Sequence, residues 1–139
     1  RILENSLAGC ENPLMKLRRA IQAHLYCSEI LQPWFYLSYM ETRGFPKDEF
    51  YRALEAELYT EKILVDIMSE GQSVGCFRQV NADFVGAAIK SILQDWYLKR
   101  WKYSRRKVSV EDYCGFIIDF VESYLLSGEK TLGASNGCE

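Results

Sequence analysis

The chemistry available to this chain rests on very few side chains, because 139 residues include a single histidine, His24. Cys27 follows three positions later, so a helix would bring an imidazole and a thiol within one turn, as a base and a nucleophile. No residue is placed to orient His24, and no glycine-rich phosphate loop, H-E-x-x-H or G-x-S-x-G motif occurs. We therefore expect no enzymatic activity and no catalytic residues.

A metal or cofactor site is equally unsupported by the residue types present. One histidine excludes a multi-histidine site, and the Glu-x-x-His repeats of di-iron bundles are missing. The five cysteines, at positions 10, 27, 76, 114 and 138, include no C-x-x-C pair. We expect no metal, no cofactor, and the reduced thiols of a cytoplasmic protein.

Polar side chains that interrupt apolar helix faces point instead to binding. A buried carboxylate needs a partner, a ligand or water, and a pocket with aromatic walls and a few convergent polar groups is typical of a small-molecule site. We predict such a site from seven residues: His24, Ser28, Trp34, Phe35, Tyr39, Glu61 and Asp95. Three alternatives stay open: a satisfied core histidine, carboxylates paired with Lys or Arg between helices, and aromatics that only fill the core.

The elements that position these residues are predicted to be helices throughout. Apolar residues recur at helical spacing over residues 12–43, 46–74, 81–103 and 109–126, and no strand-like alternation of useful length occurs. Pro33 is expected to kink or split the first pattern, and Gly44, Gly75 and Gly128 to end helices. Asn81 or Asp83 is a plausible N-cap of the third helix, and Ser109 with Asp112 resembles a capping box for the fourth.

The last two helices carry more apolar surface than one chain can cover. The third is apolar almost all round, and the apolar arc of the fourth spans about 200° where one core needs little more than 100°. We predict a homodimer with Ile89, Ile92, Trp96, Phe116, Phe120 and Tyr124 at its interface. The alternative is that the first two helices cover these faces within the chain.

Charge and hydropathy exclude two classes of partner. The formal charge of −2 argues against a general nucleic-acid binder, so the basic residues between positions 99 and 107 are expected to be a solvated helix end. No stretch approaches the roughly 18 apolar residues that span a bilayer, so no membrane association is expected. We predict one domain over residues 1–128 and a flexible polar tail over 129–139.

One stretch of sequence resembles a known family. Residues 70–78, EGQSVGCFR, are similar to the "EG…G.FR" junction of TetR-family transcriptional regulators, and an Ala-rich apolar helix follows as in that family. The residues WYLKRW at 96–101 and EDY at 111–113 continue the pattern of one subgroup. The likeness extends over about residues 12–126.

The resemblance implies an all-helical effector-binding and dimerisation domain, with the last two long helices in a four-helix bundle with the partner subunit. It further implies an apolar or aromatic effector whose binding changes the spacing of two DNA-reading heads, most simply in a repressor. The family's N-terminal helix-turn-helix is not within these residues, and operator DNA would be bound only through such a domain. The alternative function is a helical protein-interaction module without DNA binding.

Overall fold

The computed structural model describes residues 1–9 and 12–126, apart from the side chain of Thr42, and every regular element among them is a helix. The elements are α1 (Ile2–Leu7), α2 (Pro13–Ile30), α3 (Gln32–Met40), the 3₁₀ turn η1 (Thr42–Gly44), α4 (Lys47–Ser73), α5 (Ala82–Leu98), α6 (Arg100–Arg105) and α7 (Val110–Leu126). The all-α expectation is confirmed for this part of the chain. The predicted tail and Gly128 lie outside the described residues.

The predicted helix starts are confirmed by their caps. The Asn81 side chain accepts a 3.0 Å hydrogen bond from the amide of Phe84 at the start of α5. The Ser109 hydroxyl accepts from the Asp112 amide at 3.0 Å, and the Asp112 carboxylate accepts from the Ser109 amide at 3.4 Å, which completes the capping box before α7.

Two predicted helices are each divided in two. The first breaks at Leu31, which leaves helical geometry so that Pro33 falls in the first turn of α3, where a missing amide proton costs nothing. The third breaks at Lys99 (φ −118°, ψ 38°), and α6 then leads the chain toward α7. The kink at Pro33 was predicted, whereas the break at Lys99 was not.

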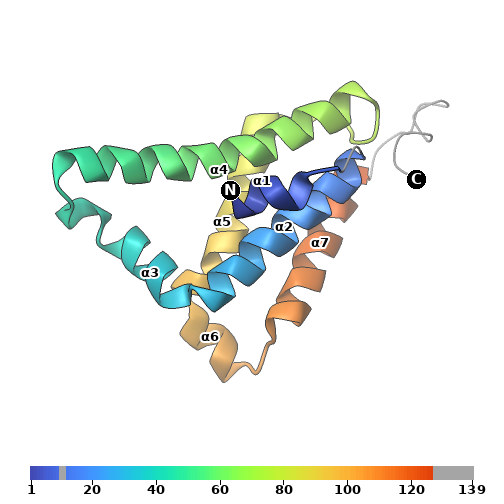
Figure 1. The fold of residues 1–139 in the computed structure, drawn as a ribbon. Coiled ribbons are helices and arrows are strands. Elements are labelled where there is room, and N and C mark those ends of the chain that lie inside the picture. Colours follow the sequence, from blue (N-terminus) through green and yellow to red (C-terminus); the bar gives the residue numbers. More distant parts are fainter. Residues whose placement is uncertain (10–11, 127–139) are drawn as a thin grey trace.

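The core lies where α2, α5 and α7 meet the second half of α4. Its fully buried large side chains are Leu17, Ile21, Leu25, Met68, Leu93, Trp96, Ile117 and Leu125. In α4 every buried residue lies at or beyond Leu64, and α3 has no buried residue at all. In Figure 1, α2, α3 and α4 outline a triangle, in which α3 and η1 connect the end of α2 to the start of α4. α3 and the start of α4 lie away from this core.

The junction that resembles the TetR motif has a structural explanation in this chain. The ring of Phe77 lies so close to Gly71 that any β-carbon there would overlap it, and Gly75 takes a left-handed φ of 78° that favours glycine. The amide of Arg78 then donates a 3.0 Å hydrogen bond to the carbonyl of Leu125. The residues of this motif therefore end α4, and the hydrogen bond of Arg78 attaches the segment that follows to the end of α7.

The expectation that all thiols are reduced is wrong for Cys76, which is disulfide-bonded. A disulfide does not require paired spacing of cysteines along the sequence. Cys27 and Cys114 are free thiols. Among the described helices, none combines the length and the apolar character needed to cross a membrane.

Candidate functional site

A group of polar side chains lies inside the fold between α2, α4 and α5. On α5, Lys90, Gln94 and Tyr97 follow one another at spacings of four and three and so share one face of the helix. All three are buried. We call them, together with Glu57 and Thr60 of α4 and His24 of α2, the inner polar cluster.

Lys90 is the charged centre of this cluster. Its side chain is 6% exposed, its ammonium hydrogen-bonds the hydroxyl of Thr60, and it lies 3.7 Å from a carboxylate oxygen of Glu57. Burial lowers the pKa of Lys90, and the negative charges of Glu57 and Glu61 offset part of that effect. The carboxylate of Glu57 also accepts a hydrogen bond from Gln94. The charge of Lys90 is therefore already compensated within the chain.

His24 is the member of the cluster whose hydrogen bonding is incomplete. Its Nδ1 atom is buried and has no hydrogen-bond partner among the described residues. Burial, and then the charge of Lys90, lower the pKa of His24 to about 3, so the ring is neutral at physiological pH. The His24 ring meets Phe35 edge-on at 6.1 Å between centroids, and Phe35 meets Tyr97 in the same way at 5.3 Å.

Six of the seven predicted ligand residues separate into three groups. His24 and Phe35 are in contact, and Glu61 acts on the same cluster through Lys90. Trp34 and Tyr39 are 72% and 50% exposed on α3. Ser28 is fully buried and donates its hydroxyl hydrogen to the carbonyl of Leu25 at 2.7 Å, so its polarity is satisfied within α2 and it is not available to a ligand.

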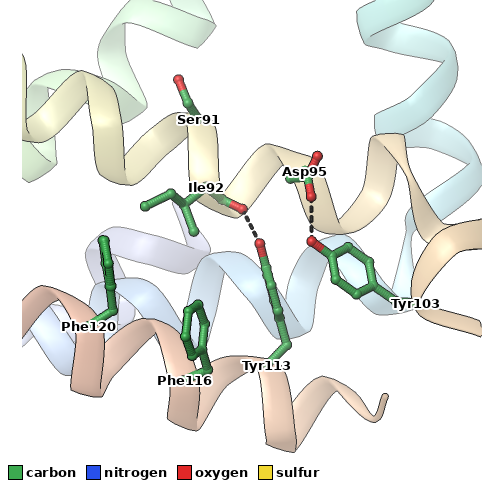
Figure 2. Close-up of a pocket in the computed structure, with 7 residues that line it drawn as sticks. All are labelled: Ser91, Ile92, Asp95, Tyr103, Tyr113, Phe116 and Phe120. Carbon is green, nitrogen blue, oxygen red and sulfur yellow. Dashed lines mark hydrogen bonds between the residues drawn. The ribbon is translucent and has the colours of Figure 1, made fainter. Parts of the chain in front are cut away.

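Asp95 was predicted beside the same pocket but lies apart from the inner polar cluster. It accepts a hydrogen bond from the hydroxyl of Tyr103 (Figure 2). It also accepts a 2.8 Å hydrogen bond from Lys102 and lies 3.4 Å from Lys99. Burial raises the pKa of Asp95, but the bonds to Lys102 and Tyr103 outweigh it and leave the pKa below its ordinary value. This agrees with the alternative that Asp95 pairs with a cation, and it fixes α6 against the end of α5.

A groove of about 430 Å³ runs between α5 and α7, beside Asp95 (Figure 2). It is lined by Ser91, Ile92, Asp95, Tyr103, Tyr113, Phe116 and Phe120. The hydroxyl of Tyr113 bridges the helices by donating a 2.7 Å hydrogen bond to the carbonyl of Ile92. Phe116 and Phe120 stack on each other at 5.9 Å and remain 58% and 55% exposed.

The exposed aromatic surface continues past the end of this groove that lies away from α6. Phe84, two turns before Ser91 on α5, is 75% exposed, and Tyr124, one turn after Phe120 on α7, is 45% exposed with the guanidinium of Arg78 4.0 Å above its ring. We call the surface formed by Phe84, Ser91, Ile92, Phe116, Phe120 and Tyr124 the α5–α7 face.

Two of the six predicted interface residues do not belong to the α5–α7 face. Ile89 is 2% exposed and Trp96 is fully buried within this chain's own core. The ring of Trp96 packs against Tyr103 and Tyr113 at centroid distances of 5.0 and 5.1 Å, the two tyrosine rings lie 4.8 Å from each other, and the indole donates its hydrogen to Glu29 at 2.7 Å. These contacts satisfy the side chain inside one protomer, so both residues are removed from the expected interface. Ile92, Phe116, Phe120 and Tyr124 retain surface on it.

Sequence reasoning missed the α5 members of the inner polar cluster because it treated that helix as apolar all round. The signal was present, since Lys90, Gln94 and Tyr97 recur at helical spacing in an otherwise apolar segment. The sequence alone did not show which residues face them, because Thr60 lies 30 positions from Lys90 and Glu57 lies 37 positions from Gln94 along the chain. Over the described ranges, no group of three or more His, Cys, Asp or Glu side chains is arranged to hold a metal ion.

Comparison with known proteins adds no assignment: no family model matches the chain, and no curated protein or solved structure matches it.

Proposed function

We propose that this chain is the effector-binding and dimerisation domain of a ligand-responsive transcriptional regulator of the TetR type. The observation that supports the proposal most is the α5–α7 face, an aromatic surface on two neighbouring helices with a groove between them. Two such helices from each of two subunits would form a four-helix bundle. The inner polar cluster on the other side of α5 supplies the candidate effector site.

The size of the α5–α7 face suits a symmetric dimer. Four aromatic side chains that are half to three-quarters exposed leave roughly 400 Å² of apolar surface, given about 150–250 Å² for each ring. That is about half of the roughly 800 Å² that each partner buries in a stable interface, and polar residues form the rim of such interfaces. A two-fold axis would place the face against itself, so that one surface satisfies both subunits.

The route from effector to output runs through α2 in this proposal. α2 carries His24 toward the inner polar cluster and packs against α1, and the hydroxyl of Tyr59 on α4 hydrogen-bonds Glu4 of α1. An effector that binds two arrangements of α2 with different affinity would shift α1 with it. A DNA-reading domain joined to α1 in the full-length protein would then respond.

The dimer is tested by sedimentation velocity at micromolar protein concentration. We expect the wild-type chain to sediment as a dimer and the double variant Phe116→Glu, Phe120→Glu as a folded monomer, because four carboxylates would be buried at one interface. Tyr51→Glu, at a tyrosine on α4 that is 53% exposed, is the matched control and should remain a dimer. A monomeric wild-type chain would overturn the dimer and favour the protein-interaction module.

The regulator assignment needs a separate test, because dimerisation alone does not imply DNA binding. We expect the coding DNA upstream of the codon for Arg1 to encode a helix-turn-helix domain of about 50 residues. An upstream sequence without such a domain would leave the chain as a helical binding module.

A further inference from the structure

α3 differs from every neighbouring long helix in how little it buries. Six of its nine residues are large apolar or aromatic side chains, yet none is classed as buried. Trp34, Leu37, Tyr39 and Met40 are all about half exposed or more. An amphipathic helix normally stabilises itself by covering one apolar face. α3 is therefore held to the protein by a small number of contacts.

Those contacts lie over the inner polar cluster. Phe35 is the part-buried ring of α3, placed between the rings of His24 and Tyr97. The side-chain amide of Gln32, in the first turn of α3, donates a 3.0 Å hydrogen bond to the carbonyl of Tyr97. Displacing α3 would thus remove the ring of Phe35 and uncover a site for one aromatic ring, with His24 and Tyr97 as its walls. We call this site the seat.

The buried groups beside this seat define what could occupy it. His24 offers a neutral nitrogen without a partner, which either accepts or donates one hydrogen bond, depending on its tautomer. A hydroxyl group satisfies both cases because it is both a donor and an acceptor. Aliphatic or aromatic rings without a polar atom would leave Nδ1 unsatisfied, which is the costly outcome for a buried polar group.

Charged occupants are disfavoured by the groups already present. A carboxylate needs an unpaired cation, but Lys90 is bound by Glu57 and Thr60, and Glu61 adds further negative charge. An ammonium group would need an anionic partner of its own, and the carboxylate of Glu57 is already bonded to Lys90 and Gln94. Burying either ion without a new partner is unfavourable.

We propose that His24 and Tyr97 form the walls of a site for an uncharged aromatic molecule that carries a hydroxyl group, and that α3 is its lid. Phe35 occupies the place of the ligand's ring in this structure and is displaced when the ligand binds. The hydroxyl group of the ligand pairs with Nδ1 of His24. This inference rests on the proposed effector-binding function and names the chemical class of the effector.

The ligand class is tested by calorimetric titration of the intact chain at pH 7 with four ring-matched probes: 2-naphthol, naphthalene, 2-naphthoate and 2-(aminomethyl)naphthalene. We expect 2-naphthol to bind about tenfold more tightly than naphthalene, the gain of one hydrogen bond to an otherwise unsatisfied group. Both charged probes should bind more weakly than naphthalene. Equal binding of naphthol and naphthalene, or tighter binding of a charged probe, overturns the ligand class.

Two variants test the residues. His24→Phe keeps a ring of similar size and should reduce the preference for 2-naphthol over naphthalene from about tenfold to about onefold. Phe35→Ala opens the seat and should tighten the binding of every ring probe that binds the wild-type chain. Tyr36→Ala, at the neighbouring residue on the same helix, should leave these affinities unchanged. If Phe35→Ala instead weakens the binding of the ring probes, Phe35 is a wall of the site, and the proposal that α3 is a lid is overturned. The wild-type probe series decides the ligand class even if a variant fails to fold.

Failure of this inference is distinguishable from failure of the proposed function. Sedimentation of the same samples reports the dimer independently of any probe. Ring probes that bind without a preference for the hydroxyl overturn the ligand class and leave the effector function standing. Absence of binding by all four probes, to both wild-type chain and Phe35→Ala, overturns the site itself while the dimer is judged by its own measurement.

Discussion

The two sides of α5 have opposite packing. Toward α2 and α7 the helix contributes Leu93 and Trp96, both fully covered, to a continuous core. Toward α3 and the first half of α4 it meets charged and polar side chains, and α3 itself contains no buried residue. The first region is a rigid support whose outer surface is aromatic, and the second is loosely covered and polar within.

This difference indicates where the molecule can respond. A fully packed core transmits displacement but does not absorb it, because its side chains interdigitate with few voids. A helix without a buried residue can leave its place at a much lower cost than a helix of the packed core. We therefore propose association on the α5–α7 side and a ligand response on the α3 side.

The largest expected effect is the difference in unfolding free energy between two tryptophan variants, one in each region. Trp96→Ala removes a fully buried indole, its stacking on Tyr103 and Tyr113, and its hydrogen bond to Glu29, and should cost about 4 kcal/mol of unfolding free energy. Trp34→Ala on α3, 72% exposed, should change it by less than about 0.5 kcal/mol. Urea unfolding measures both, and similar costs would remove the contrast between the two regions.

A second pair of variants compares glycines on covered and open helix surfaces. Gly71→Ala forces the ring of Phe77 to move and should destabilise the chain by about 2 to 3 kcal/mol. Gly115→Ala meets no atom of the chain and should stabilise it by up to about 1 kcal/mol. Both are measured by urea unfolding in the Phe116→Glu, Phe120→Glu background, so that association does not contribute. A destabilising Gly115→Ala would show that the α7 surface is not open.

A smaller contrast than those within the two pairs of variants is expected for the pH dependence produced by the loosely covered side. The unfolded chain protonates His24 below about pH 6.5, whereas the folded chain resists protonation until its pKa of about 3. Stability is therefore complete above pH 6.5 and is lost as the pH falls toward 3. Between pH 7 and pH 5 the loss should be about 1 to 2 kcal/mol.

The control for this pH dependence is His24→Phe, compared with the wild-type chain by urea unfolding at both values. His24 is the single histidine of the chain, and the other ionisable groups of the inner polar cluster, Lys90, Glu57 and Tyr97, are the same in both chains. The variant should lose the dependence between pH 7 and pH 5. An unchanged dependence in His24→Phe would mean that His24 is not shielded as described.

Local patterns in the sequence determined the helices and most of their ends. The caps at Asn81 and Ser109, the break near Pro33 and the end at Gly75 depend only on residues within a few positions, so they could be predicted without a fold. The apolar excess of the last two helices was equally visible. The sequence also placed Phe35 and Glu61 with His24 in one candidate site.

Tertiary structure decided which apolar and polar residues face which neighbour. Ile89 and Trp96 have the composition of interface residues but are covered by their own chain, and Asp95 is drawn to Lys102 and Tyr103 by the break at Lys99. Lys90 finds Glu57 across two helices, which no local spacing encodes. The periodicity of a helix fixes how wide its apolar face is, whereas the packing of distant helices fixes which part of that face remains exposed.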